Sequence, residues 1–466
     1  MKKTDSPKSN ALKKLVSNKK KLTICIIALV LICIMLAVLL VRCINGRNAL
    51  LTLKVDGKTY SISSNIYKFM LATWKGELVY SNESIQNHKP TQDAFWDIMD
   101  TYDGKTLETS DSYYRKYVLE VCKNYLISLY LFDKYNLELS ETAQKEIDDA
   151  INELILNDGE GSKTKLNSVL SEYGINHKML KEYYVMEAKR KAVFDHIYAT
   201  SGPNLKNKFL NENYVHYYQI VLTNYTYIYE TDKNGDTIYY NTATNEIMYK
   251  KTEFTQMTDK GEIETDSKGN IIYYTDVSRT HISYDAENGK RSHKLDSNGE
   301  YLTKSMTEDE LAALEERAYD LSRDLQNVTK DAFFAKATEI SDELNVDLYT
   351  DGCYLYKNMD YYASYGTKEY IELDEMLEKL SDPSIENGSV FVVTSHAGYR
   401  ILFKCAPTDQ AYDLEANEAW FESFPVFFTT KMFAEYAEPY VTQIEVNEKL
   451  YAKVPNMKEI AINYFY

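Results

Sequence analysis

The chain has 466 residues, of which 44% are hydrophobic and 26% charged, and its formal net charge is −17. This length allows two or three domains, and the composition is that of a folded globular protein. The first 21 residues contain eight lysines and one acid, so the remainder carries −24. So acidic a surface excludes a nucleic-acid binder, because phosphate recognition needs clustered lysine and arginine.

Residues 22–41 are twenty residues without a charge, enough for one helix to cross a hydrocarbon core. The lysines before this segment place the N-terminus in the cytoplasm and the residues after Arg42 outside. We therefore predict a cytoplasmic basic tail over 1–21, a single transmembrane anchor over 22–42, and a location in the cell membrane with the bulk of the chain extracytoplasmic. Two alternatives stay open: a cleaved secretory signal, although no A-x-A site follows, and a lipoprotein signal at Cys43, although Arg42 stands where a small residue is needed.

Apart from Cys25, Cys33 and Cys43, which lie in or beside the anchor, the cysteines are few and odd in number: Cys122, Cys353 and Cys405. They imply no disulfide framework. Cys122 lies on the apolar face of a predicted helix, which indicates a buried small side chain, and Cys353 is the one we would test for reactivity. Zinc spacings, phosphate loops and Ser/His/Asp arrangements are absent from the sequence, so we expect no cofactor and no metal.

The first part of the extracytoplasmic region is predicted to be a hairpin followed by helices. Alternating apolar residues surround Asp56-Gly57, which is the pattern of a β-hairpin over 51–60. Apolar residues at helical spacing then predict helices over 112–133, from Ser140 onward, over 165–174 and over 177–199. Gly202-Pro203 ends this mostly helical region.

Residues 224–305 have a different pattern. An Asp-x-x-Gly turn followed by β-prone residues recurs at 231–240, 265–274 and 295–303. This predicts a run of weakly repeated hairpins. Turn chemistry explains the Asp and Asn side chains better than calcium does, because the glycine stands too early for an EF-hand loop.

After this insert the sequence predicts helices and then strands. A capping box begins a helix at Thr307, and two more helices follow over 330–341 and 371–380. Two apolar strands in 388–405 meet at His396-Ala397-Gly398. The order of one strand, an insert, three helices and two strands predicts an α+β layer domain.

Several stretches together follow the plan of one protein family. They are VDGKTYSISSNIYKFML, YLISLYLFDKYNLELSETAQKEIDDAINELI, LSEYGINHKMLKEYYVMEAKRKAVFDHI, GPNLKNKFLNENYVHYYQIVL, FFAKATEISDE and GSVFVVTSHAGYRILFKC. In order and pattern, though with few identities, they resemble the PrsA-type foldases of Gram-positive bacteria, built on the SurA/parvulin plan. The resemblance covers nearly all of 50–466 except the insert.

The resemblance implies an α+β fold with three parts after the anchor. The first is a mostly helical SurA/PrsA-like chaperone domain over 49–210. The second is a parvulin-like domain over 214–407 with the β-hairpin insert at about 224–305. The third, residues 408–466, contains a predicted helix broken near Pro425 and a final strand, and we expect it to pack back on the chaperone lobe.

The expected catalytic positions depart from the family pattern. Parvulin isomerases carry facing histidines in the first and last strands, but aligned on QIVL and GYRIL this chain has Gln219 and Arg400 there. The nearby His216 and His396 are out of register, and we interpret both as surface residues. We therefore predict that isomerase activity is absent or very weak.

The remaining site positions also come from the resemblance. The acidic or cysteine position after the second helix corresponds to Asp342 or Glu343, and the following Gly-rich segment to DGCYL, with Cys353. The substrate-binding residues implied for the apolar proline pocket are Leu355, Leu373 and Tyr399.

Three functions are compatible with these features. The first is a membrane-anchored chaperone or foldase that assists unfolded or nascent secreted polypeptides, with the parvulin-like domain catalytically impaired. The second is an active peptidyl-prolyl cis–trans isomerase with an atypical site. The third is a cell-surface interaction protein that acts through the insert. A homodimer stays open, and so do the identities of the clients.

Overall fold

The computed structural model describes residues 49–466 except 103, 344–348, 362–365, 367 and 465, and for 368–370 it describes the backbone alone. The basic tail, the predicted anchor at 22–42 and Cys43 lie outside the described residues. Within the described part, no helix is both long enough and apolar enough to cross a membrane.

The chain forms two compact units. The first unit comprises the residues up to Ser201 together with 425–466, and the second unit is Gly202–Phe424. Residues 202–210, which the sequence analysis placed in the helical domain, and 408–424, which it expected to pack on that domain, thus belong to the second unit. The physical reason is an aromatic cluster, in which the rings of Phe209, Tyr214 and Phe421 all lie within 6 Å of the Phe424 ring centroid.

The first unit is mostly helical. Its elements, in chain order, are β1 (Ala49–Val55), β2 (Lys58–Ser63), α2 (Ser64–Tyr80), α3 (Asp93–Asp97), β3 (Met99–Asp100), β4 (Glu108–Thr109), α4 (Ser110–Lys134), α5 (Glu141–Asn157), α6 (Lys163–Leu170), η1 (Ser171–Tyr173), α7 (His177–Thr200), α14 (Phe424–Val441), β13 (Ile444–Val446) and α15 (Glu448–Tyr451). The turn between β1 and β2 uses Asp56 and Gly57, both at positive φ, as the sequence predicted. β13 pairs with β1, so the C-terminal strand completes a three-stranded sheet with the N-terminal hairpin.

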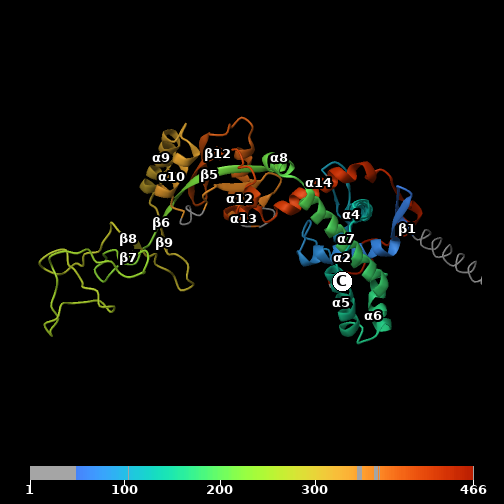
Figure 1. The fold of residues 1–466 in the computed structure, drawn as a ribbon, viewed down its shortest axis with the longest axis horizontal. Coiled ribbons are helices and arrows are strands. Elements are labelled where there is room, and N and C mark those ends of the chain that lie inside the picture. Colours follow the sequence, from blue (N-terminus) through green and yellow to red (C-terminus); the bar gives the residue numbers. More distant parts are fainter. Residues whose placement is uncertain (1–48, 103, 344–348, 362–365, 367, 465) are drawn as a thin grey trace, which may run out of the picture. The chain divides into compact units, whose positions relative to one another are not determined.

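Local capping fixes where the helices of the first unit begin. The Ser140 hydroxyl accepts the amide of Ala143 at the start of α5, and the Asn176 side chain accepts the Lys178 and Met179 amides at the start of α7. α7 then packs against α4, α5 and α6 (Figure 1). The buried side chains shared by α2, α5, α6 and α7 include Phe69, Ile151, Leu166, Leu170 and Leu180.

The second unit contains a four-stranded antiparallel sheet. Its elements are α8 (Pro203–Asn213), β5 (Tyr214–Thr223), β6 (Tyr225–Tyr227), β7 (Tyr239–Asn241), β8 (Gly289–Arg291), β9 (Thr303–Ser305), α9 (Glu308–Asp324), α10 (Lys330–Ile340), β10 (Cys353–Tyr356), α12 (Lys368–Ser381), β11 (Val390–Ser395), β12 (Gly398–Cys405), η3 (Ala411–Asp413), η4 (Glu415–Asn417) and α13 (Glu418–Phe421). The strand order is β10-β5-β12-β11, with β5 and β12 at the centre. The α+β layers predicted from the sequence are present, and β10 lies between the second and third predicted helices, where the sequence analysis placed no strand.

The two faces of this sheet are covered by different helices. On one face, alternate residues of β5 such as Ile220 and Leu222 pack with Leu314 and Ala318 of α9 and with Phe333 of α10. On the other face, Tyr217 and Leu402 pack with Leu355 of β10 and with Met376 and Leu380 of α12. The period-2 alternation of β5 and β12 therefore divides their side chains between two apolar layers.

The insert leaves the sheet through a short two-stranded stem. β6 pairs with β9, and Tyr225 lies opposite Ser305. Each repeated turn closes a hairpin, as shown by the bridges Thr231–Thr237, Thr265–Ile271 and Leu295–Tyr301. The sequence therefore predicted these three hairpins correctly.

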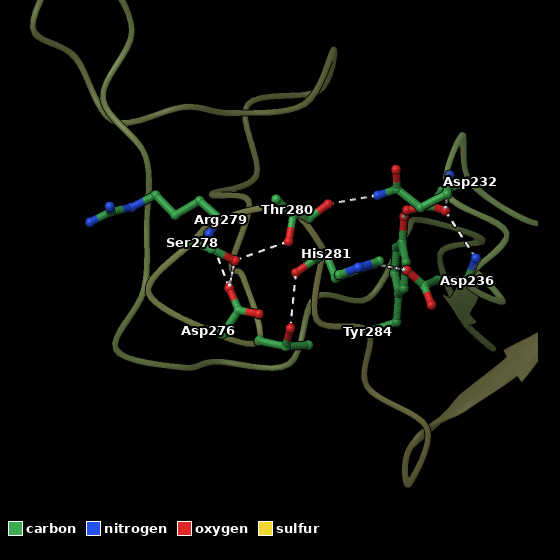
Figure 2. A network of polar contacts seen from close by, with 10 residues as sticks. Asp232, Asp236, Asp276, Ser278, Arg279, Thr280, His281 and Tyr284 are labelled. Carbon is green, nitrogen blue, oxygen red and sulfur yellow. Dashed lines mark hydrogen bonds and ion pairs between the residues drawn. The ribbon is translucent and has the colours of Figure 1, made fainter.

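The hairpins of the insert are also cross-linked to one another. In Figure 2 the turn holding Asp232 and Asp236 faces the segment 276–284. The His281 Nδ1 atom lies 3.1 Å from the Asp236 carboxylate, and the Tyr284 hydroxyl donates to Asp232 over 3.3 Å. Contacts between turns more than forty residues apart make the insert one connected body, which the repeat pattern alone did not indicate.

Candidate functional site

Strand register brings Gln219 and Arg400 to the same face of the sheet. Gln219 lies opposite Leu402, and Arg400 lies opposite Val221, so the two polar residues are diagonal neighbours on β5 and β12. This face is the one covered by α12. The two positions singled out from the sequence therefore lie in one site.

Five side chains form a continuous row of polar contacts across this face, which we call the polar row. Its members are His396, Glu372, Arg400, Gln219 and Glu343. The Arg400 Nη1 atom donates to the Gln219 amide oxygen at 2.9 Å, and the Gln219 amide nitrogen donates to Glu343 at 2.9 Å. The orientation of the Gln219 amide follows from these partners, since its oxygen meets a donor and its nitrogen meets a carboxylate.

The other end of the polar row is anchored by a buried carboxylate. The Glu372 side chain is only 6% exposed, and one of its oxygens lies 3.4 Å from Arg400 Nε. Its second oxygen accepts the backbone amide of His396 at 2.6 Å and contacts the His396 ring. Since an unpaired carboxylate is costly to bury, Arg400 serves here as the counter-ion of Glu372.

Asp342 has a structural position at the edge of β5. Its backbone amide donates to the Val221 carbonyl at 2.8 Å, and its carboxylate accepts the Thr223 amide at 2.9 Å. The Ser341 hydroxyl accepts the Val221 amide at 3.0 Å. The segment after α10 thus supplies hydrogen-bond partners to the backbone groups of β5 that β10 does not pair with. Of the two acids, Glu343 is the one that reaches the polar row.

Cys353 and Leu355 are buried beneath the site. Both belong to β10, where they lie opposite Tyr217 and Val215, and each is 2% exposed. Burial raises the pKa of the Cys353 thiol, and the nearby Glu343 carboxylate raises it further. Cys353, the cysteine singled out for a reactivity test, is thus a buried thiol with a raised pKa, which supplies little thiolate.

The two remaining pocket candidates are on opposite faces of the sheet. Leu373, on α12, packs against the apolar layer beneath the polar row. Tyr399 lies opposite Leu222 and packs against the α9/α10 layer. The structure therefore brings Leu355 and Leu373 together with Arg400 but separates Tyr399 from them, because neighbouring residues of a strand point to opposite faces.

The two histidines differ in exposure. His396 has a side chain that is 49% exposed, in keeping with its interpretation as a surface residue. His216 is only 1% exposed, so the same interpretation was wrong for it. Its ring stacks on Tyr354 at 4.3 Å, and its two nitrogens lie 2.8 Å and 2.6 Å from the carbonyl oxygens of Ala406 and Asp351. His216 thus joins the segments that contain Ala406 and Asp351, on the sheet face opposite Arg400.

One small pocket borders the polar row at Gln219 and Glu343. The pocket lined by Gln219, Glu343, Tyr349 and Cys353 has a volume of about 10 Å³, enough for about one water molecule. Ligand pockets usually measure roughly 300–1,000 Å³. This pocket is therefore far smaller than a ligand site.

The sequence analysis missed Glu372, although a signal for it was present. Glu372, Met376 and Leu380 are spaced by four residues and are all buried on α12. A glutamate on the apolar stripe of a helix predicts a buried carboxylate that needs a cation. Arg400, an arginine within an apolar strand, is the matching signal.

Removal of the Glu343 charge should change the pH dependence of stability. Burial raises the pKa of Glu343, and the Gln219 hydrogen bond and the Arg400 charge oppose this only in part. The folded state therefore holds the Glu343 proton to higher pH than the unfolded state does. As a result, the free energy of unfolding falls as pH rises from about 4.5 through the folded pKa. We expect Glu343→Gln to gain stability relative to the parent chain over that window, measured by denaturant unfolding between pH 4 and pH 7. The exposed Glu339→Gln is the control, and a difference that stays constant or shrinks as pH rises would refute the assignment.

Comparisons with known proteins give little beyond the geometry. No protein family matches the chain, and no curated protein does. Three solved chains match, among them the foldase protein PrsA from Streptococcus pneumoniae. That structure is 13% identical, the alignment covers 78% of this chain and 99% of that chain, and the TM-score is 0.19. A TM-score this low supports no inference, so the proposals below depend on the residues of this chain.

Proposed function

We propose that the chain is a membrane-anchored extracytoplasmic foldase-type chaperone for unfolded or nascent secreted polypeptides, with a parvulin-like site that has lost most or all isomerase activity. The sequence resemblance to PrsA-type foldases supports the general role. The observation that carries the second part is the polar row, which holds Arg400 where the resemblance implies a histidine.

The chemistry of prolyl isomerisation explains why the polar row matters. The enzyme must strip water from the imide and stabilise a twisted peptide against a barrier of about 20 kcal/mol. An apolar slot does this, whereas Arg400 brings a permanent charge that is already paired with Glu372. A substrate proline would have to displace that ion pair, and the pocket beside Gln219 and Glu343 has a volume of only about 10 Å³.

Surface apolar residues of the first unit support the chaperone role. A groove of about 510 Å³ between α7 and α14 is lined by Phe194, Tyr198 and Val426, and Val426 is 61% exposed. Apolar side chains left open at a groove mark an interaction surface. Such a surface offers contact area without directional demands, which suits clients of varied sequence.

Aggregation of an unfolded client tests the chaperone role. We expect the full chain to suppress light scattering by a denatured secreted protein in a dose-dependent way. Absence of suppression at a several-fold molar excess over client would contradict the proposal.

The insert supports a second candidate, an interaction role at the cell surface. Its base carries a cluster of rings, with His293 within 5.0 Å of Tyr227, Tyr229 and Tyr301, and with Arg291 stacked 3.9 Å over Tyr229. Because Tyr225 pairs with Ser305, an Asn-Gly turn can replace 226–304 and close the stem. If the shortened chain still suppresses aggregation, the chaperone role is favoured. If suppression disappears, an interaction role of the insert is favoured.

A further inference from the structure

The first unit contains a second groove, larger than the one between α7 and α14, and it lies between α5, α6 and α7. Its volume is about 800 Å³, within the roughly 300–1,000 Å³ typical of ligand pockets. The apolar lining consists of Leu129, Ile151, Ile155, Val185 and Met186. Ile151 is buried, whereas Val185 and Met186 are half-buried and face an open groove.

Lysines dominate the charged side chains of this groove. Lys163, Lys178, Lys181 and Lys189 line it, against two acids, Asp148 and Glu182. These side chains give a local charge of +2, in a chain whose residues after 21 carry −24. The sign of the groove is therefore opposite to that of the molecule around it.

Two of these lysines remain available to a ligand. Lys181 forms an ion pair with Asp148, and Lys189 lies 4.8 Å over the Phe132 ring. Lys163 and Lys178 are exposed and form no ion pair with any residue that the structure describes. Burial lowers the pKa of His177 between them, and the charges of Lys163 and Lys178 lower it further, which indicates a positive potential at this end of the groove.

We propose that this groove binds apolar polypeptide segments flanked by acidic residues, and that Lys163 and Lys178 select them. The apolar lining contacts the hydrophobic part of the segment, and the lysine side chains attract the flanking carboxylates. This inference deepens the proposed chaperone function by naming the class of client sequence. It commits to a polypeptide occupant because the charge of the groove complements acidic flanks while its lining suits an apolar core.

Fluorescence anisotropy with two labelled peptides tests the inference on the full chain. The peptides share one leucine-rich core and differ in flanks, which are glutamates in one and lysines in the other. We expect the glutamate-flanked peptide to bind about tenfold more tightly, since several exposed charge pairs, each weak alone, add to this ratio. The preference should decline with added salt, because these charges are exposed to solvent.

Charge-reversal variants locate the site. Lys163→Glu/Lys178→Glu should abolish the preference, while Lys449→Glu/Lys453→Glu, which changes net charge equally at exposed positions of the same unit, should retain it. Met186→Gln should weaken binding of both peptides by removing apolar contact. Equal affinities for the two peptides, a preference retained in the groove variant, or a dimer whose second copy occupies the groove would each overturn the inference.

The aggregation assay separates this inference from the proposed function. If the parent chain suppresses aggregation but shows no flank preference, the groove assignment fails and the chaperone role stands. If the parent chain does not suppress aggregation, the chaperone role fails, and the peptide measurement still decides whether the groove binds acidic-flanked segments.

Discussion

Replacing Arg400 by alanine is expected to destabilise the second unit by about 2–4 kcal/mol. Removing one partner of a buried ion pair costs roughly 3–5 kcal/mol, because it leaves an uncompensated charge in the interior. We expect a smaller loss than this for Arg400→Ala, because the Arg400 side chain keeps 24% of its surface exposed. Among the described residues, Glu372, which is 6% exposed, would keep only the contacts with His396. Denaturant unfolding at neutral pH measures the loss.

The double variant Arg400→Met/Glu372→Gln is the control for that prediction. It removes both charges and preserves most of the volume, so it should recover most of the stability lost in Arg400→Ala. If the double variant is no more stable than Arg400→Ala, Arg400 acts through packing and not as the counter-ion of Glu372.

A single methyl group at Gly398 is expected to cost more than about 3 kcal/mol. Gly398 has φ +134, and a Cβ placed there would lie 2.0 Å from the Leu222 carbonyl oxygen of β5. Strained backbone alone costs about 1–3 kcal/mol, and the clash falls on backbone that cannot rotate away. Moving this end of β12 would also displace Arg400, two residues further along. Thermal unfolding of Gly398→Ala measures the effect.

Gly388 provides the matched comparison for Gly398. It also has positive φ (+92) and lies just before β11, but a Cβ there would meet nothing within 4 Å. Gly388→Ala should cost only the roughly 1–2 kcal/mol of a left-handed residue with a side chain. Equal losses in the two variants would show that close contact with β5 is not what requires glycine at 398.

Local chemistry made much of the fold predictable. Asp56-Gly57 specifies a hairpin turn, Thr307 forms a capping box with Glu310, and the two-residue connection His396-Ala397 joins β11 to β12. In each case the deciding groups lie within a few residues of one another. The sequence is therefore sufficient to indicate the local structure.

Long-range contacts account for most of what the sequence did not predict. β10 is a strand because Cys353 and Leu355 find partners on β5 more than a hundred residues earlier. His216 is buried because Tyr354 and the carbonyl groups of Ala406 and Asp351 surround its ring. No periodicity near His216 carries information on partners so distant in the chain.

The candidate site was predictable in part for the same reason. The out-of-pattern residues Gln219 and Arg400 could be recognised within apolar strands, and register places them on one face. Glu372, by contrast, lies on a helix whose position the sequence does not specify, and its pairing with Arg400 follows only from the packing of α12 on the sheet. The separation of Tyr399 from Leu373 likewise depends on which face each helix covers.

A protease-coupled prolyl-peptide assay on the full chain tests the central proposal most directly, namely that a site occupied by the polar row does not catalyse prolyl isomerisation. The account predicts no acceleration of cis–trans isomerisation above the uncatalysed rate, under conditions in which the same preparation suppresses client aggregation. Turnover comparable to that of an active parvulin, lost on mutation of Gln219 or Glu343, would contradict it.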